Sequence, residues 1–185
     1  MALEDSGYDK KPFEPKMAAA VIGNAMGAMR KEMTDLRVYK FYNEDILKKT
    51  PAFASLPAEK RDAMIREYEA GLDAGILNIT EDTMPGELSN VTAGRIANIF
   101  NLNGPNMTMD AACASSMAAL DYAVLGLRAG KFDIAVAVGA DEIMSAPAYV
   151  KFCKIGALSP DGSFSFDQRA NGFVMAEAVA VYILK

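Results

Sequence analysis

One cysteine of the sequence stands where its thiol could act as a nucleophile. The residues Asp110-Ala111-Ala112-Cys113-Ala114-Ser115-Ser116 join an alternating polar and apolar stretch to a run with apolar residues at helical spacing. A cysteine at the start of a helix lies near free backbone N–H groups and the positive end of the helix dipole, which favours the thiolate. The small alanines leave room for a carbonyl to approach, and the Cys113 N–H could point at a developing oxyanion. The pattern predicts a nucleophile elbow at Cys113.

The same cysteine has a simpler interpretation. A lone cysteine among alanines is often a small buried hydrophobic side chain. The residues alone leave both interpretations open. Cys153, in Lys151-Phe152-Cys153-Lys154, has no comparable setting, so we expect it to be structural, with the two lysines as the only argument for reactivity.

The composition narrows the chemistry further. The 185 residues include no histidine, so no imidazole of this chain can act as a base or a metal ligand. The two cysteines form neither a C-x-x-C pair nor another zinc-ligand spacing, and we expect no metal site. With 19 basic and 24 acidic residues and no basic cluster, the chain is not expected to bind nucleic acid.

The apolar stretches are too short for a membrane protein. Met17–Met29 and Ile134–Ala140 are the longest, and neither could cross a bilayer. The N-terminal residues lack the basic flank and apolar core of a secretory signal. We therefore expect a cytoplasmic protein whose thiols stay reduced, with no membrane partner.

Alternating strands and helices must position the cysteine. Strands are predicted at Met17–Gly23, Asn106–Asp110, Ile134–Gly139 and Ala178–Leu184, and all but the second are expected to be buried. Helices are predicted from Pro57 to Gly71, from Ser89 to Phe100, from Ala111 to Gly130 and, in short form, within residues 143–160, whereas residues 28–50 are expected to be irregular with some helix. Such alternation is typical of an α/β layered fold.

Two of these helices carry clear apolar faces. Met64, Ile65, Tyr68 and Leu72 fall on one face of the first. In the second, Ala93, Ile96, Ala97 and Phe100 are expected to face inward, with Ser89 or Asn90 as the N-cap. At its two ends the sequence opens in what looks like the tail of a helix and closes one residue after a strand. We therefore expect part of a longer domain.

The segment MDAACASSMAAL resembles the active-site motif of β-ketoacyl synthases, most closely that of ketosynthase domains in polyketide and polyunsaturated fatty acid synthases. ALEDSGYD, MAAAVIGNAMG and the stretches 86–116 and 139–185 also resemble that family, in the family's order, whereas the similarity is weak over roughly residues 28–80. The resemblance implies an α/β, thiolase-like layered fold. Residues 1–185 would be a partial β-ketoacyl synthase N-terminal domain, truncated at both ends and holding part of the first αβα half only.

The resemblance also implies a reaction. Cys113 would take an acyl chain from a phosphopantetheine thioester on an acyl carrier protein. The parent protein would then condense this chain with a malonyl-type extender, with loss of carbon dioxide and without a bound cofactor. The strand Asn106–Asp110 would lie near the two-fold interface of a homodimer.

Other site residues are implied by position. Ala112, Ile143, Ala148 and Phe152 fall where the family lines its acyl pocket, although the apolar residues would suit a core equally well. Asp167 and Glu177 match positions that support the elbow through a polar network. The family usually has Gly-Glu-Gly where this chain has Ala176-Glu177-Ala178, and the added methyl groups could strain that turn.

The family's two histidines, which assist decarboxylation, are implied to lie downstream of Lys185. We therefore expect the isolated chain to be inactive in condensation. Two other hypotheses stay open: a non-catalytic module that binds carrier protein or another synthase part, and acyl transfer to Cys113 without condensation.

Overall fold

The structure is a computed structural model that describes residues 1–185 except 9, 12–16, 26–28 and 143. The chain forms two compact units, one of Met1–Met29 with Leu88–Lys185 and the other of Arg30–Glu87. The first unit contains α1 (Ala2–Asp5), β1 (Ala18–Gly23), α7 (Ser89–Ile99), β2 (Asn106–Met109), α8 (Ser115–Arg128), β3 (Ile134–Asp141), α9 (Ala146–Lys154) and β4 (Ala178–Leu184). The second contains the helices α2 (Met29–Val38), α3 (Lys40–Lys49), α4 (Pro51–Ala54), α5 (Ala58–Gly75) and α6 (Thr83–Glu87).

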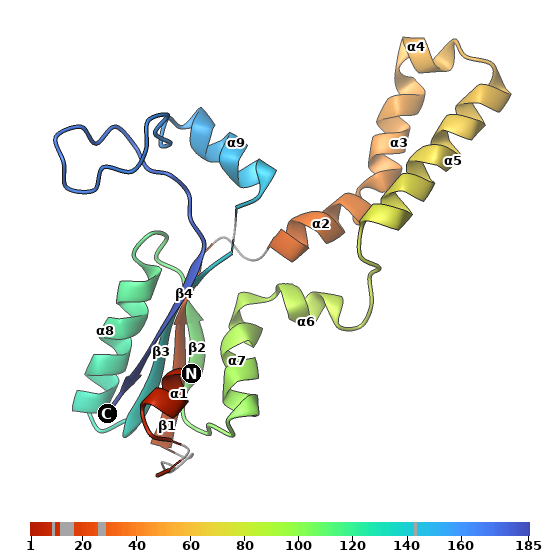
Figure 1. The fold of residues 1–185 in the computed structure, drawn as a ribbon. Coiled ribbons are helices and arrows are strands. Elements are labelled where there is room, and N and C mark those ends of the chain that lie inside the picture. Colours follow the sequence, from red (N-terminus) through yellow and green to blue (C-terminus); the bar gives the residue numbers. More distant parts are fainter. Residues whose placement is uncertain (9, 12–16, 26–28, 143) are drawn as a thin grey trace. The chain divides into compact units, whose positions relative to one another are not determined.

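A sheet with strand order β2-β1-β3-β4 forms the centre of the first unit (Figure 1). β1 pairs in parallel with both β2 and β3, and β4 runs antiparallel to β3. Each strand lies where the sequence predicts it, within one or two residues at the ends. The expected α/β layered fold is therefore confirmed.

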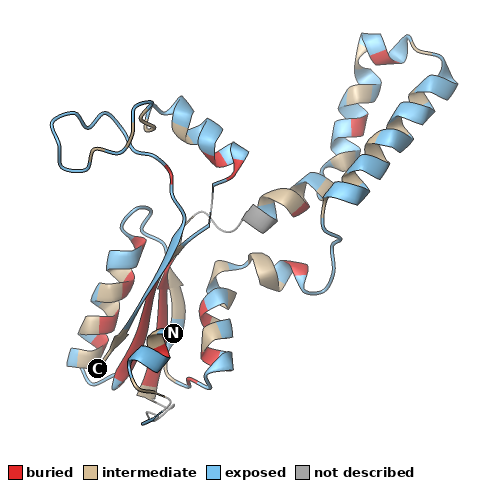
Figure 2. Cartoon of the chain, in the orientation of Figure 1, coloured by how far each residue is buried: buried red, intermediate tan, exposed pale blue. Residues whose placement is uncertain are grey.

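Small side chains on β1 let a helix pack closely on each face of the sheet. Alternate residues of a strand point to opposite faces. Ala18, Ala20 and Ile22 pack with α7, through Ala93 and Ala97. Ala19 and Val21 pack on the other face with α8, through Ala119 and Ala123. Figure 2 shows β1 and most of β3 as buried, which confirms the predicted burial of these two strands.

β4 is a strand, but it is not buried. Val179 is 69% exposed and Tyr182 61% exposed. The prediction of a buried strand is therefore wrong, and the strand order gives the reason. β4 ends the sheet, so among the described strands only β3 lies beside it.

The helices of the first unit follow the sequence closely, with differences at their ends. Ala93, Ile96 and Ala97 of α7 face the core as predicted. Phe100 does not, because it follows the last helical turn and is partly exposed. The N-cap of α7 is Leu88 and has no side-chain hydrogen bond, so the predicted Ser89 or Asn90 cap is wrong.

The second unit is more helical than the sequence predicts. Residues 28–50 were expected to be irregular with some helix, but α2 and α3 fill most of this stretch. α5 passes through Gly71 and ends at Gly75, and none of its residues is buried. Of its predicted apolar face, Met64 is exposed and the other three residues are half-buried. A glycine inside a helix costs only about 1 kcal/mol, so Gly71 does not end the helix.

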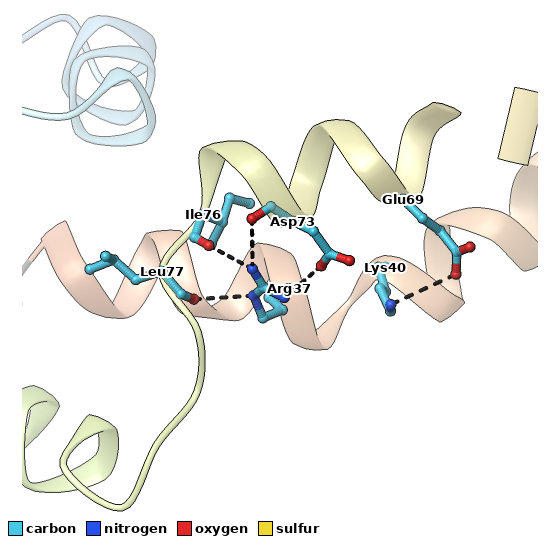
Figure 3. A network of polar contacts seen from close by, with 6 residues as sticks. All are labelled: Arg37, Lys40, Glu69, Asp73, Ile76 and Leu77. Atoms are coloured by element: carbon cyan, nitrogen blue, oxygen red, sulfur yellow. Dashed lines mark hydrogen bonds and ion pairs between the residues drawn. The ribbon is translucent and has the colours of Figure 1, made fainter. Parts of the chain in front are cut away.

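Charged contacts join α2 and α3 to α5 (Figure 3). Arg37 donates to a side-chain oxygen of Asp73 at 2.6 Å and to the carbonyl oxygens of Ile76 at 2.6 Å and Leu77 at 3.1 Å. Lys40 of α3 lies 3.7 Å from Glu69 of α5. A cation at a helix C-terminus satisfies free carbonyls and complements the dipole, so Arg37 fixes the end of α5.

The described helices do not meet the requirements of a membrane span. None of them is both long enough and apolar enough to cross a bilayer.

Candidate functional site

Cys113 lies in a tight turn between β2 and α8. β2 ends at Met109 and α8 begins at Ser115, so the cysteine precedes the helix by two residues. The sequence predicted it in the first helical turn, and this detail is wrong. The Ala114 N–H donates to the Ala111 carbonyl at 3.0 Å and the Ser115 N–H to the Ala112 carbonyl at 3.1 Å. These bonds close separate turns, and the regular helix starts only after them.

The residue before the cysteine has an unusual backbone conformation. Ala112 has φ = 49°, in the left-handed region. For a residue with a Cβ this conformation costs roughly 1–2 kcal/mol, so the surroundings must hold it. A side-chain oxygen of Asp110 accepts a hydrogen bond from the Ala112 N–H at 2.9 Å. The chain therefore turns sharply at Ala112, and the role of this turn as a nucleophile elbow stays a prediction.

Both cysteines are free and exposed. The interpretation of Cys113 as a buried hydrophobic side chain is therefore wrong. Cys153 lies on the surface of α9, so exposure alone does not distinguish the two thiols. What distinguishes Cys113 is its place in a strained turn at the start of α8.

Ser115 connects the turn to the helix, a role that the sequence analysis missed. Its side chain is buried, and its hydroxyl accepts from the Ala111 N–H at 2.8 Å and donates to the Ala112 carbonyl at 2.6 Å. A serine at the first helical position after a cysteine turn was the signal that could have found it. The hydroxyl spans the turn that carries Cys113.

Two glycines let the start of α8 contact the sheet directly. Gly23 and Gly139 are paired neighbours near the ends of β1 and β3. A Cβ on Gly23 would lie 2.3 Å from the Ser115 carbonyl carbon, and one on Gly139 would lie 2.8 Å from the Ser116 Cβ. Because Gly23 and Gly139 have no side chains, the start of α8 can approach the sheet this closely.

Asn24 forms hydrogen bonds that connect the ends of three strands near the elbow. Its backbone N–H donates to the Met109 carbonyl at 3.1 Å, and its side-chain amide donates to the Ala140 carbonyl at 2.9 Å. These bonds link the carboxyl ends of β1, β2 and β3. The elbow is thus built at the edge where ligands usually bind in parallel sheets.

Two of the predicted pocket residues form a small apolar cluster. Ala148 is fully buried against Met175, and Phe152 packs against them. The Phe152 ring also lies edge-on to Phe173, with centroids 5.4 Å apart. In the described part of the chain, this cluster includes neither Cys113 nor Ala112. Ile143 lies outside the described residues, so the assignment of the pocket stays a prediction.

The two predicted supporting carboxylates lie in different settings. Asp167 is exposed and accepts hydrogen bonds from the Arg169 side chain at 2.9 and 3.1 Å. The Arg169 guanidinium lowers the pKa of Asp167 below its usual range. Glu177 accepts from the Met144 N–H at 2.8 Å, which ties the approach to β4 to the segment that follows β3. Among the side-chain hydrogen bonds of the described residues, neither carboxylate bonds to the elbow.

The alanines beside Glu177 fit without left-handed strain. Among the described residues, the non-glycine residues with positive φ are Asn101, Ala112 and Phe166. Ala176 and Ala178 are not in that set, so the replacement of two family glycines does not force either residue into a glycine-type conformation.

The model of the β-ketoacyl synthase N-terminal domain matches residues 1–185. This chain belongs to the β-ketoacyl synthase family. The family consists of condensing enzymes, and the resemblance noted from the sequence is confirmed.

Among curated relatives of this ketosynthase chain is one of the polyunsaturated fatty acid synthase proteins of Thraustochytrium sp. The two are 33% identical over 185 residues, which are 100% of this chain and 6% of that protein. A highly reducing polyketide synthase of Aspergillus terreus is 36% identical over 166 residues, 82% of this chain and 6% of that protein. The chain thus spans a small fraction of these relatives.

Solved structures confirm the thiolase-like fold of the ketosynthase chain. A β-ketoacyl synthase from Burkholderia phymatum superposes with a TM-score of 0.67 at 21% identity, covering 98% of this chain and 38% of that one. The ketosynthase from module 6 of the bacillaene synthase of Bacillus subtilis gives a TM-score of 0.63 at 23% identity, covering 98% of this chain and 24% of that one.

Proposed function

We propose that Cys113 accepts an acyl group from a phosphopantetheine thioester, as the loading step of a ketosynthase reaction. The observation that carries the proposal is the exposed Cys113 thiol in the strained turn between β2 and α8 of a β-ketoacyl synthase family member. Residues 1–185 would then be part of a longer ketosynthase domain.

The loading step is a thiol–thioester exchange. The Cys113 sulfur attacks the thioester carbonyl carbon and forms a new carbon–sulfur bond. The carbon–sulfur bond to pantetheine breaks, and the thiol proton passes to the leaving pantetheine sulfur. Backbone N–H groups at the start of α8 favour negative charge on the attacking sulfur and on the carbonyl oxygen, which lowers the barrier.

The remaining predicted residues have supporting roles in this proposal. Ala112 lies beside the nucleophile, and Ala148 and Phe152, with Ile143, would contact the apolar part of the acyl chain. In support, Phe152 is only partly buried where it packs against Ala148 and Met175. Glu177 would hold the segment before α9 through its bond to the Met144 N–H, and Asp167 would order its own loop through Arg169.

Condensation requires more than this chain contains. Histidine is absent from the 185 residues, whereas the family resemblance implies two histidines for decarboxylation of the extender. We propose that the full-length protein, as a homodimer, supplies them and condenses the acyl group with a malonyl-type unit delivered by an acyl carrier protein. The isolated chain would load an acyl group without extending it.

The missing histidines also favour a second candidate, acyl transfer to Cys113 as the whole function. Thioester exchange needs only a nucleophilic sulfur and hydrogen-bond donors for the oxyanion. The two candidates differ in their products, since only condensation releases carbon dioxide and forms a β-ketoacyl thioester.

The test uses the full-length protein that carries this chain, supplied with acyl and malonyl carrier-protein thioesters. We expect Cys113→Ala to abolish the β-ketoacyl product and Cys153→Ala to leave it unchanged. Product formation by Cys113→Ala at the wild-type rate would overturn the proposal. Acylation of wild-type Cys113 without a β-ketoacyl product would identify the second candidate. A folded wild-type protein that binds carrier protein but is not acylated would indicate a non-catalytic module.

A further inference from the structure

The Cys113 turn needs something to hold it, because its backbone is strained. The left-handed Ala112 carries a Cβ, and such a conformation persists only when neighbouring groups fix it. Asp110 provides one bond, to the Ala112 N–H, but Asp110 is itself exposed and lies on the same loop. A second and better anchored group is therefore required.

The Ser115 hydroxyl meets this requirement. Ser115 is 4% exposed and is part of α8, which packs against the sheet. Its hydroxyl oxygen accepts from the Ala111 N–H at 2.8 Å, and its O–H donates to the Ala112 carbonyl at 2.6 Å. One hydroxyl thus holds both sides of the strained residue, with both of its hydrogen-bonding roles used.

The sheet keeps Ser115 from moving. A Cβ on Gly23 would come within 2.3 Å of the Ser115 carbonyl oxygen, so the serine backbone already rests on the strand. Ser116 is in contact with Gly139 in the same way, through its Cβ. These contacts with β1 and β3 therefore fix the position of the Ser115 hydroxyl. The hydroxyl in turn fixes the position of the turn that carries Cys113.

We propose that Ser115 is the positioning residue of the nucleophile: it holds Ala112 in the left-handed conformation and so keeps the Cys113 thiol presented to solvent. This inference rests on the proposed role of Cys113. It adds to that role a named residue that does not touch the substrate and acts through the turn.

The experiment compares the two cysteines of one molecule. The full chain is alkylated with iodoacetamide, and the rates at Cys113 and Cys153 are measured by peptide mass spectrometry. We expect Ser115→Ala to lower the ratio of the Cys113 rate to the Cys153 rate about fivefold, the equivalent of one net hydrogen bond. Ser116→Ala keeps the Cβ that contacts Gly139 and is the matched control, with the ratio unchanged.

The direction of the change separates positioning from a merely structural role. Loss of local structure alone would make Cys113 easier to alkylate, so an unchanged or raised ratio in Ser115→Ala overturns the proposal. Because iodoacetamide is not an acyl donor, this result is independent of whether Cys113 is acylated by thioesters.

A second measurement uses the wild-type chain. It therefore tests the proposed role of Ser115 even if Ser115→Ala does not fold. The bond to Ser115 predicts slow hydrogen exchange at the Ala111 N–H in the wild-type chain, although Ala111 lies outside the helix and is exposed. Exchange of that N–H at the rate of an unprotected amide overturns the proposal.

Discussion

Each of the two units is stabilised internally by a different kind of interaction. Around the elbow, alanines and glycines bring backbone and helix into direct contact, and every residue of β1 is buried. In Arg30–Glu87, none of the 18 residues of α5 is buried, and Arg37 joins the helices through polar contacts. Close packing fixes positions to a fraction of an ångström, whereas exposed charged contacts fix them less tightly. The unit that carries the candidate nucleophile is the closely packed one.

Figure 2 shows the same contrast in exposure, with the buried residues concentrated on β1, β3 and the inner sides of α7 and α8. Large apolar side chains of the second unit, such as Phe41 and Tyr42, are mostly exposed. Matched substitutions in the two units should therefore have unequal effects.

The largest difference is expected for phenylalanine. Phe132 is 1% exposed and packs between β1 and α8, whereas Phe41 is 66% exposed. Phe132→Ala should lower the free energy of unfolding by about 3–5 kcal/mol through the cavity it leaves. Phe41→Ala should change it by less than about 0.5 kcal/mol. Urea unfolding of both variants measures this, and equal losses would mean that the two units are packed alike.

A glycine-to-alanine substitution should lower stability in the first unit and raise it in the second. Gly23→Ala places a Cβ against the Ser115 backbone and should destabilise the first unit by about 2–3 kcal/mol or more. Gly71→Ala on α5 meets nothing within 4 Å and should stabilise its helix by up to about 1 kcal/mol. Thermal unfolding of the two variants gives the signs. A Gly23→Ala protein as stable as the wild type would contradict the close contact at the elbow.

The charged contacts of the second unit are tested at Arg37. Arg37→Met should destabilise the last turn of α5 by about 1.5–3 kcal/mol, because the carbonyl oxygens of Ile76 and Leu77 lose a charged donor. Arg66→Met, at an exposed site of the same helix, is the control. Amide hydrogen exchange of α5 reports the local change, and equal protection in the two variants would argue against Arg37 as the main connection.

The smallest effect concerns Asp167, which lies in the packed unit but makes an exposed charged contact. Its pKa is lowered from the ordinary 3.8 by hydrogen bonds from Arg169. A lowered carboxyl pKa adds stability that is present above pH 3.8 and is lost as the pH falls through the lower folded value. Carboxyl NMR titration should show Asp167 titrating below its ordinary pKa, and Arg169→Gln should raise that pKa toward 3.8. No change in Arg169→Gln would exclude the pair as the cause.

The sequence predicted the first unit more completely than the second. The difference in packing between the two units is the reason. In the first unit, the apolar runs at Met17–Gly23 and Ile134–Gly139 predicted buried strands correctly, because helices cover both faces. In the second, the extent of α2 and α3 was underestimated because charged residues make up half of each helix and interrupt the apolar residues. The burial of β4 was wrong because composition does not reveal which strand lies at the edge of a sheet.

At the site, the sequence predicted the elbow and the cysteine but not the groups that hold them. The DAACASS motif singled out Cys113, whose thiol is exposed in the structure, and its role as the nucleophile stays a prediction. The hydrogen bonds of Ser115 are local, and its role was missed although a local signal was present. Gly23 and Gly139 were missed because their contacts with Ser115 and Ser116 join residues far apart in the chain. Contacts of this kind depend on strand register and helix height, which local patterns do not encode.

The central claim is that Cys113 is the acyl acceptor. Its most direct test is intact-protein and peptide mass spectrometry of the folded chain after incubation with an acyl-pantetheine thioester. We predict a mass increase of one acyl group, located on the Cys113 peptide, lost in Cys113→Ala and kept in Cys153→Ala. A folded chain that gains no acyl group, or gains it equally on Cys153, would contradict the account.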